Sequence, residues 1–448
     1  MHSNNRTRSE LPDEWRYEPL GLVIRNELQN GAFIKKPTRG KGVLFANVVD
    51  MYRGVQLDCS RLERIDVSEK DVSKYFLNGG DIVVVRSSLK REGIGQCCVV
   101  PELTEPVFFD CHLIRVAPDP TKLDPTFLSF FWRSEVGKRE LIQRSKTTTM
   151  TTLNQAGLSS AIVPVPPLSE QQNIATLLST VQRAIDRQER LIALTAELKK
   201  ALMHKLFTEG IRGEPLKRTE IGPVPDSWTV TTLGELCKKP DGRIQTGPFG
   251  SILHKNEYQD VGTPIVNPVH LVNSQIDHTD VPRVGESAAQ RLHRYRLKVN
   301  DLLFGRRGDI GRHAIVSDAE VDWFCGTGCF IVRVSDPRVD ARFLNAYLSK
   351  ERVISWLQSH ATGVIMPNLS NKVLERLPIC FPNRVEQTAI AAALRAVDAK
   401  ALAHARIAVT LNDVFRTLLH RLMTAQIRVH DLDLCALDEL AAEIAEVT

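Results

Sequence analysis

Two glycine-rich loops in this sequence carry arginines in a pattern suited to binding nucleic acid. One is Gly305–Arg312 (GRRGDIGR), and the other is Arg86–Gln96 (RSSLKREGIGQ). Glycines let a loop approach a phosphate backbone closely, and the forked guanidinium of arginine binds phosphates or the edge of guanine. A single basic loop is most often solvated surface. Two such loops at corresponding places in the two halves of the chain favour a function in binding nucleic acid.

Further glycine-containing loops with cations lie upstream of these two. They are Lys35–Lys41 (KKPTRGK) in the first half and Thr246–Lys255 (TGPFGSILHK) in the second. Charge is also concentrated locally, because Arg283–Arg312 holds eight Lys or Arg against three acidic residues, in a chain of net charge +5. The predicted DNA-binding residues are Lys35, Lys36, Arg39, Lys41, Arg86, Lys90, Arg91, Lys146, Thr246, Lys255, Arg306, Arg307 and Arg312.

No motif for catalysis accompanies these loops. The sequence has neither a Gly-x-x-x-x-Gly-Lys-Ser/Thr phosphate loop nor a Gly-x-Gly-x-x-Gly turn after a strand, and it lacks the Asn-Pro-Pro-aromatic stretch of amino-methyltransferases. Cys325 and Cys329 have no second Cys or His pair nearby, so a zinc site is not predicted. We therefore assign no catalytic and no metal-binding residues.

A tandem repeat organises the elements that carry the basic loops. Glu170–Val181 (EQQNIATLLSTV) matches Glu386–Val397 (EQTAIAAALRAV) without a gap, 216 positions later. Leu11–Trp15 (LPDEW) matches Val224–Trp228 (VPDSW) at an offset of 213. Loop insertions within a duplicated fold produce such a small drift in the offset. The chain is therefore predicted to hold two copies of a globular unit followed by a long helix.

Both long helices show apolar residues at alternating spacings of four and three, which is the pattern of a coiled-coil seam. Pro167 and Ser169 precede the first helix, and Gly210 and Gly213 end it. The two seams share one register. The predicted seam residues are Ile174, Leu178, Val181, Ile185, Leu202, Leu206, Ile390, Leu394, Val397, Leu411, Phe415, Leu418 and Leu422.

An approximate two-fold axis between the copies pairs the helices antiparallel, because a two-fold across the helix direction reverses it. The symmetric register places Leu178 opposite Leu418, and it places Lys199 beside Val397 with its amine free to reach solvent. A parallel pair is one competing arrangement. Two helices that each pack along their own globular unit are another.

The globular units show the patterns of mixed strands and short helices, so the predicted fold class is α/β (mixed α+β). The tail from Asp431 holds six acidic residues and no Lys or Arg, which is typical of a solvated end. The predicted divisions are a first globular domain at 1–166, a helix at 167–212, a second globular domain at 213–382, a helix at 383–428 and an acidic tail at 429–448.

Composition places the protein among globular intracellular chains. No run approaches 18 apolar residues, and the first fifteen residues lack an apolar signal region, so neither a membrane span nor secretion is predicted. Nine cysteines without framework spacing are typical of a reducing compartment. We expect a cytoplasmic protein.

Five short stretches, taken in their order along the chain, resemble the specificity (S) subunit of type I restriction-modification systems. They are PLSEQQNIA before the first helix, KLFTEGIR at its end, then IGPVPDSW, TLGEL and TGPFGS. The resemblance covers essentially the whole chain, including the repeat. The start of the second helix departs from the pattern of that family, because it has PNRVEQ where the family usually has Pro-Leu-x-Glu-Gln.

The resemblance implies two target-recognition domains, each reading one half of a bipartite DNA sequence, separated by an antiparallel coiled coil. It also implies two modification subunits that bind S-adenosylmethionine and methylate adenine, and restriction subunits that use ATP and Mg. This chain would bind no cofactor and would not be catalytic. The competing hypotheses are an unrecognised two-domain DNA-modifying enzyme or nuclease, and a DNA-independent scaffold.

Overall fold

The computed structural model describes residues 12, 14–34, 38–249, 252–363 and 367–432. The chain divides into two compact units. Unit 1 comprises residues 1–190 and 405–448, and unit 2 comprises Leu191–His404. The predicted boundaries set the long helices apart from the globular domains. Those boundaries stay a prediction. By compactness, each unit contains one globular part together with half of each long helix, and the ends of both helices are buried in the two cores.

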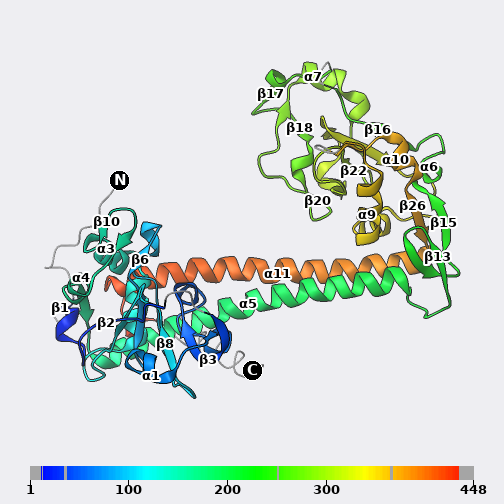
Figure 1. Ribbon diagram of the computed structural model, residues 1–448. Coiled ribbons are helices and arrows are strands. Elements are labelled where there is room, and N and C mark those ends of the chain that lie inside the picture. The colour runs from blue at the N-terminus through cyan, green and yellow to red at the C-terminus, as the bar shows by residue number, and fades with distance from the viewer. Residues whose placement is uncertain (1–11, 13, 35–37, 250–251, 364–366, 433–448) are drawn as a thin grey trace. The chain divides into compact units, whose positions relative to one another are not determined.

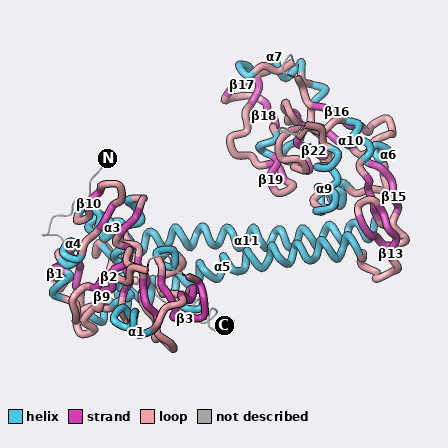
Figure 2. Tube along the Cα trace, in the orientation of Figure 1, coloured by secondary structure: helices cyan, strands magenta, loops and turns pink. Residues whose placement is uncertain are grey.

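The globular part of unit 1 consists of small, mostly antiparallel sheets with short helices packed on them (Figures 1 and 2). Its central sheet has the order β2-β9-β5-β7, and all four residues of β5 (IVVV) are buried, as expected for a strand covered on both faces. The elements are β1 (Arg16–Pro19), β2 (Gln29–Asn30), β3 (Arg39–Ala46), β4 (Glu63–Ile65), α1 (Glu69–Val72), β5 (Ile82–Val85), β6 (Ser87–Ser88), β7 (Cys97–Val99), β8 (Val107–Phe109), β9 (Leu113–Val116), α2 (Pro125–Arg133), α3 (Glu135–Gln143), β10 (Lys146–Thr147), β11 (Thr151–Thr152), α4 (Gln155–Ser159) and β12 (Ile162–Val165).

The globular part of unit 2 has the same construction around a sheet of order β16-β25-β22-β23. A second four-stranded sheet has the order β17-β21-β18-β24. The elements are β13 (Leu216–Thr219), β14 (Gly222–Pro225), β15 (Thr229–Thr232), α6 (Leu233–Leu236), β16 (Arg243–Thr246), β17 (Tyr258–Gln259), β18 (Thr263–Val266), β19 (Leu271–Val272), β20 (Gln275–Ile276), β21 (Arg283–Val284), α7 (Glu286–Arg291), β22 (Leu302–Gly305), β23 (His313–Ile315), β24 (Phe324–Cys325), β25 (Cys329–Arg333), α8 (Ala341–Leu348), α9 (Glu351–His360), α10 (Asn371–Arg376) and β26 (Pro378–Phe381).

The central sheets of the two units repeat each other in register. Gln29 of β2 pairs with Arg115 of β9, and Gln245 of β16 pairs with Ile331 of β25. Both partners in unit 2 stand 216 positions after those in unit 1. The tandem duplication and the mixed α/β fold predicted from the sequence are confirmed.

The two long helices are α5 (Leu168–Thr208) and α11 (Arg384–Met423), and each is shared between the units. In unit 1 the first part of α5 shares a core with the last part of α11, through Leu178 and Leu422. In unit 2 the end of α5 shares a core with the start of α11, through Phe207. The helices therefore pack together antiparallel, as predicted. Among the helices that the structure describes, none has both the length and the apolarity needed to cross a membrane.

An ion pair in unit 2 marks the relative register of the helices. Nζ of Lys199 lies 2.6 Å from Oδ1 of Asp398, the residue next to Val397. The Lys199 side chain is 33% exposed, so its amine can reach solvent as predicted, and it also pairs with this carboxylate. All thirteen predicted seam residues are at least partly buried, and Ile192 and His404 in the middle are half-buried.

A buried glutamine fixes the start of each long helix to its globular part. Oε1 of Gln171 accepts a hydrogen bond from the Asp124 main-chain N–H at 2.8 Å. Its Nε2 donates to the main-chain oxygens of Lys122 and Pro166, both at 2.8 Å. The amide thus uses its oxygen and both of its N–H groups, which removes the cost of burying it.

Unit 2 contains the same arrangement. Oε1 of Gln387 accepts from the Asp340 main-chain N–H at 2.7 Å, and Nε2 donates to the main-chain oxygens of Arg338 and Pro382 at 2.8 Å. Asp124 and Asp340 are the N-caps of α2 and α8. One side chain therefore joins the long helix, the proline joint before it and the start of a core helix.

The glutamate before each glutamine joins the two long helices. Glu170 accepts from the indole N–H of Trp15 at 3.2 Å and pairs with the guanidinium of Arg428, which follows α11. In unit 2, Oε2 of Glu386 lies 3.5 Å from Nε of Arg212, which follows α5. The end of one helix thus meets the start of the other in both units, as antiparallel packing requires.

We predict that Gln171→Leu destabilises unit 1, because it leaves one buried N–H and two buried carbonyls without partners. The expected loss is roughly 2–4 kcal/mol in the free energy of unfolding. Urea unfolding followed by fluorescence and circular dichroism measures it. The matched control is Gln172→Leu, one position along the same helical turn at an exposed site. Equal transition midpoints for the two variants would contradict the role assigned to Gln171.

Candidate nucleic-acid interface

In unit 2 the two predicted loops leave the central sheet at the same edge. Thr246, the last residue of β16, pairs with Phe330 of β25. Gly305, the last residue of β22, pairs with Cys329, the neighbouring residue on the other side of the same strand. Loops far apart in sequence therefore begin next to each other, and they bring Thr246 close to the arginines that follow Gly305.

Arg306 is held in place by contacts from three segments. Its main-chain N–H donates to Gly328 at 2.7 Å, and its carbonyl accepts from the Leu369 N–H at 2.9 Å. Its Nε donates to Oδ1 of Asn368 at 3.2 Å, and its guanidinium carbon lies 5.5 Å from the centre of the Phe249 ring. The half-buried side chain is thus oriented before any ligand binds.

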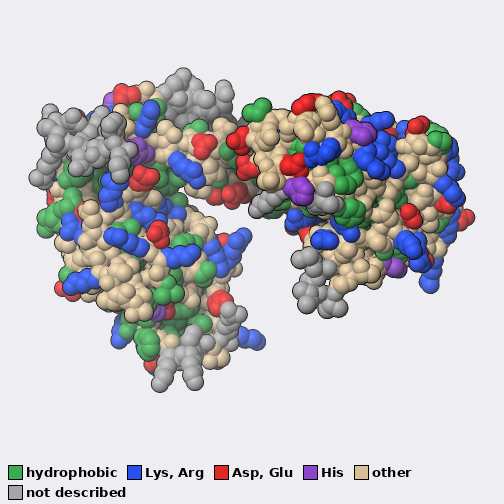
Figure 3. All heavy atoms as spheres, turned by 90° about the horizontal axis from the view of Figure 1, so that it is seen from above, with side chains coloured by type: hydrophobic (Ala, Val, Ile, Leu, Met, Phe, Trp, Pro, Cys, Tyr) green, Lys and Arg blue, Asp and Glu red, His purple; other side chains and the backbone are tan. Residues whose placement is uncertain are grey.

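Arg307 and Arg312 lie in the same loop and are exposed. Nε of Arg312 lies 2.8 Å from Oδ2 of Asp309, and this carboxylate partly offsets the positive charge of the arginine. Arg307 forms no ion pair with any described residue, so its charge is available to a phosphate. On the face of unit 2 seen in Figure 3, Lys and Arg side chains are spread among apolar ones.

Arg86 occupies the same position in unit 1. Its main-chain N–H donates to His112 at 2.9 Å, and its carbonyl accepts from the Leu153 N–H at 2.7 Å. These are the contacts that Arg306 makes with Gly328 and Leu369. The side chain differs, since Nη1 of Arg86 donates to the Cys111 carbonyl at 3.5 Å.

A small sheet places Lys146 near this arginine. Lys146 of β10 pairs with Thr152 of β11, and Thr152 pairs with Ser87 of β6, the residue after Arg86. Lys90 and Arg91 follow in the next turn, and both are exposed. Four of the predicted DNA-binding residues of unit 1 therefore lie on adjoining segments.

Other predicted residues lie elsewhere. Arg39 and Lys41 belong to β3 of a different sheet, of order β4-β3-β8. Lys255 stands in a short 3-10 turn, Lys255–Glu257. Lys35 and Lys36 lie outside the described residues. Proximity in sequence to a glycine-rich loop did not place these residues beside Arg86 or Arg306.

Two exposed phenylalanines that are not among the predicted residues lie at the same edges of the two sheets. Phe33 follows β2, and Phe249 follows β16. The side chain of Phe33 is 76% exposed and that of Phe249 is 51% exposed. The sequence carried a signal for them, because Gly31-Ala32-Phe33 and Gly247-Pro248-Phe249 stand 216 positions apart, the offset of the long helices.

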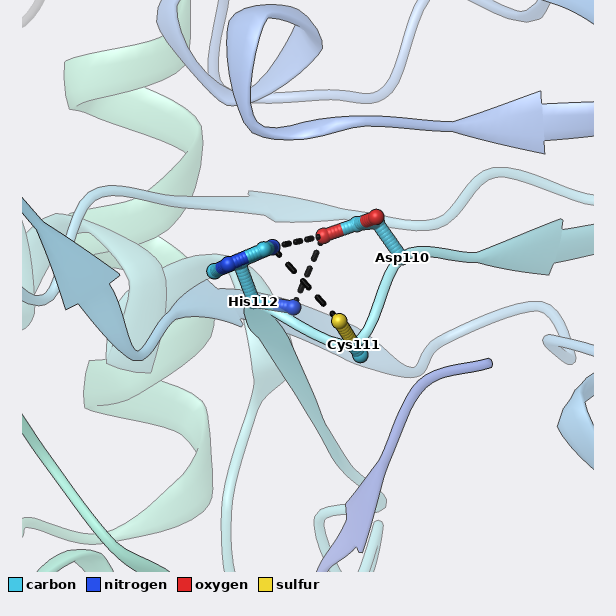
Figure 4. A group of neighbouring side chains, drawn as sticks. All are labelled: Asp110, Cys111 and His112. Atoms are coloured by element: carbon cyan, nitrogen blue, oxygen red, sulfur yellow. Dashed lines mark hydrogen bonds and ion pairs between the residues drawn. The ribbon is translucent and has the colours of Figure 1, made fainter. Parts of the chain in front are cut away.

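Unit 1 also contains a group of possible metal ligands, Asp110, Cys111 and His112 (Figure 4), with ligand atoms within 4.8 Å of one another. Oδ1 of Asp110 already accepts from the His112 main-chain N–H at 2.8 Å and lies 2.6 Å from its Nδ1. Burial raises the pKa of the Cys111 thiol, which disfavours the thiolate that binds metals. The bonds between Asp110 and His112 are those of a tight turn, and the His112 carbonyl of this turn accepts the main-chain N–H of Arg86.

Comparisons with known proteins give one consistent result. The profile described as "Type I restriction modification DNA specificity domain" matches residues 24–196 and 225–412. The putative type I restriction enzyme MjaX specificity subunit of Methanocaldococcus jannaschii is 24% identical over 430 residues, covering 94% of this chain and 95% of that protein. The EcoBI specificity subunit of Escherichia coli is 21% identical over 299 residues, covering 63% and 61%.

Solved structures support the same fold. The S subunit of a type I restriction-modification system from M. genitalium superposes with a TM-score of 0.59 at 17% identity, covering 94% of this chain and 98% of that one. A chain from a study of complex assembly and conformational transition of the type I R-M system gives a TM-score of 0.50 at 18% identity, covering 93% and 100%.

We predict that replacing Arg306 and Arg307 together by alanine weakens binding to duplex DNA and flattens its salt dependence. The slope of log affinity against log salt should fall by about 0.9 for each phosphate that the variant no longer neutralises. If an arginine instead reads guanine, binding weakens by about 1–3 kcal/mol, and only at sites with that base. Fluorescence anisotropy at several salt concentrations measures both effects.

The control for charge is Arg406→Ala, at an exposed position on α11. Replacing Lys90 and Arg91 by alanine tests unit 1 in the same way. Unchanged affinity after all four loop substitutions would place the DNA-binding face elsewhere.

Proposed function

This chain belongs to the type I restriction-modification DNA specificity family, and on that premise we propose that each of its units reads one half of a bipartite duplex sequence. The chain is a DNA-specificity subunit, and its relatives are named as such. It is the non-catalytic component of its system. The proposal concerns how its two units divide the recognition.

The observation that carries the proposal is the equivalence of Arg86 and Arg306. The same pair of main-chain hydrogen bonds holds each arginine at the same edge of the repeated sheet. Cations at that edge can contact phosphates, which sets the position of the protein on the duplex. Arginine also has hydrogen-bond donors that can read the edge of a base. Two equivalent surfaces with different side chains suit two different half-sites.

The hydrogen bonds made by the buried side chains of Gln171 and Gln387 support the same proposal. Bipartite recognition needs each reading surface to keep a fixed orientation relative to its own end of the helix pair. In each unit the glutamine joins the long helix to the helix that packs against the central sheet, α2 or α8. Preorganisation of this kind reduces the entropy cost when the surface binds.

We further propose the partners of this chain. Two modification subunits that bind S-adenosylmethionine would dock on it, and restriction subunits would bring ATP and Mg. The complex would act in the cytoplasm. This chain would contribute orientation and sequence recognition and bind none of these cofactors. The alternative of an unrecognised modifying enzyme or nuclease is not favoured, since the curated relatives are named as specificity subunits.

A selection experiment tests the proposed division of recognition. The chain, assembled with the modification subunits from its own host, is used to select from a library of random duplexes. The selected sequences should contain two conserved blocks separated by a spacer of fixed length. Arg86→Ala should weaken the preference within one block, and Arg306→Ala within the other. A single block, or loss of both blocks in either variant, would refute the division.

We also predict that the purified chain alone neither methylates nor cleaves DNA. The reason is that its sequence carries no phosphate loop and no methyltransferase motif. Incubation with DNA and tritium-labelled S-adenosylmethionine, and separately with DNA and Mg, measures the two activities. Addition of the modification subunits should restore methyl transfer and serves as the positive control. Label transferred to DNA by the single chain would show an active site that the motifs do not reveal.

A further inference from the structure

The most unusual feature of the candidate interface is apolar. Phe33 and Phe249 are large hydrophobic side chains left 76% and 51% exposed, although burying a phenylalanine stabilises a protein by roughly 1.5–3 kcal/mol. A single exposed apolar residue is ordinary. Two at equivalent positions of a duplicated fold, both on the edge that carries the predicted arginines, call for a common explanation.

The turns that present these rings are built alike. The Gly31 N–H donates to Leu113 at 3.2 Å, and the Gly247 N–H donates to Cys329 at 2.8 Å. A Cβ on either glycine would lie 2.2 Å from a carbonyl oxygen, that of Asp110 or of Gly326. Glycine is therefore required at both positions, because any side chain would push the turn away from the sheet.

The residue after each glycine points inward. Ala32 is 2% exposed, and Pro248 is also buried. The following residue is then directed outward, and in both copies it is phenylalanine. The tight turn thus fixes where the aromatic ring emerges, at the end of β2 in one unit and of β16 in the other.

A charged group lies next to one of these rings, that of Phe249. The Arg306 guanidinium carbon lies 5.5 Å from the Phe249 ring centre, a cation–π distance, and exposed Arg307 follows it. Aromatic residues and arginine are both enriched at protein interfaces as well, so this pair alone fits either kind of partner. Duplex DNA is favoured because the proposed function already brings it to this edge, where phosphates meet the cations and the bases offer apolar faces and thymine methyl groups.

We propose that Phe33 and Phe249 each make an apolar contact with a base of the half-site read by their own unit. This inference rests on the proposed function and adds to it the residues that act beside the arginines. The arginine fixes the position of the strand, and the ring contacts a base through a thymine methyl group or at a base step.

The test uses the chain assembled with the modification subunits from its own host and a library of random duplexes. Phe249→Ala should lower affinity for the selected wild-type sequence roughly 5- to 150-fold, as removal of one base interaction does. Base preference should weaken within one block, and Phe33→Ala should weaken it within the other. The salt dependence should change less than in the variant that lacks Arg306 and Arg307, because the cations themselves remain.

Conservative variants and matched controls separate this role from folding. Phe249→Leu and Phe33→Leu keep an apolar side chain and should retain most of the affinity. Val261→Ala and Leu22→Ala change apolar residues that are 80% and 61% exposed in other turns of the two units, and they should have no effect. Thermal unfolding of each variant should match that of the wild type.

The outcomes are distinguishable. If the wild type selects no sequence, the proposed function fails and this inference fails with it. If the wild type selects two blocks and both alanine variants keep them at unchanged affinity, the inference alone is wrong. If the alanine variants fail to assemble with the modification subunits in the absence of DNA, the rings bind protein, and the inference is also overturned.

Discussion

A single buried side chain at the start of each long helix sets the geometry of its unit. Gln171 and Gln387 are fully buried, and a buried amide is tolerated only when its oxygen and both N–H groups have partners. The three partners come from two segments, the proline joint and the loop before α2 or α8. Within a unit, the direction of the long helix relative to the core helix is therefore fixed by hydrogen-bond geometry, which is more directional than apolar packing.

The repeated sheet separates the framework of the interface from its chemistry. The main-chain bonds that hold Arg86 and Arg306 are the same, but Asp110, Cys111 and His112 stand in unit 1 where unit 2 has Gly326–Gly328. Because these bonds join backbone groups, side chains at the edge, other than at Gly31 and Gly247, can change without breaking them. A duplicated specificity protein needs this property if its two surfaces are to read different bases.

Much of the fold could be predicted from the sequence because repeats and heptads are local patterns. The 216-residue offset identified both units, and the alternating apolar spacing identified α5 and α11. The site was harder, because its residues come together through strand pairing over long distances in sequence. Arg39 and Lys41 share a loop-like stretch with Lys35 but lie on another sheet. Phe33 and Phe249, which we propose as base contacts, were not predicted because charge guided the prediction, and exposure of an apolar residue depends on the turn before it.

The division of the chain has a consequence for the order in which the protein folds during synthesis. Unit 2 is one continuous segment, Leu191–His404, whereas unit 1 joins residues 1–190 to residues 405–448. Leu419, Leu422 and Met423 complete the core around Ile174 and Leu178. Because these residues of α11 are synthesised last, the apolar surface of α5 that they cover in unit 1 stays uncovered until then. Domains often fold in N- to C-terminal order as they are synthesised, but here the unit that begins first is completed last.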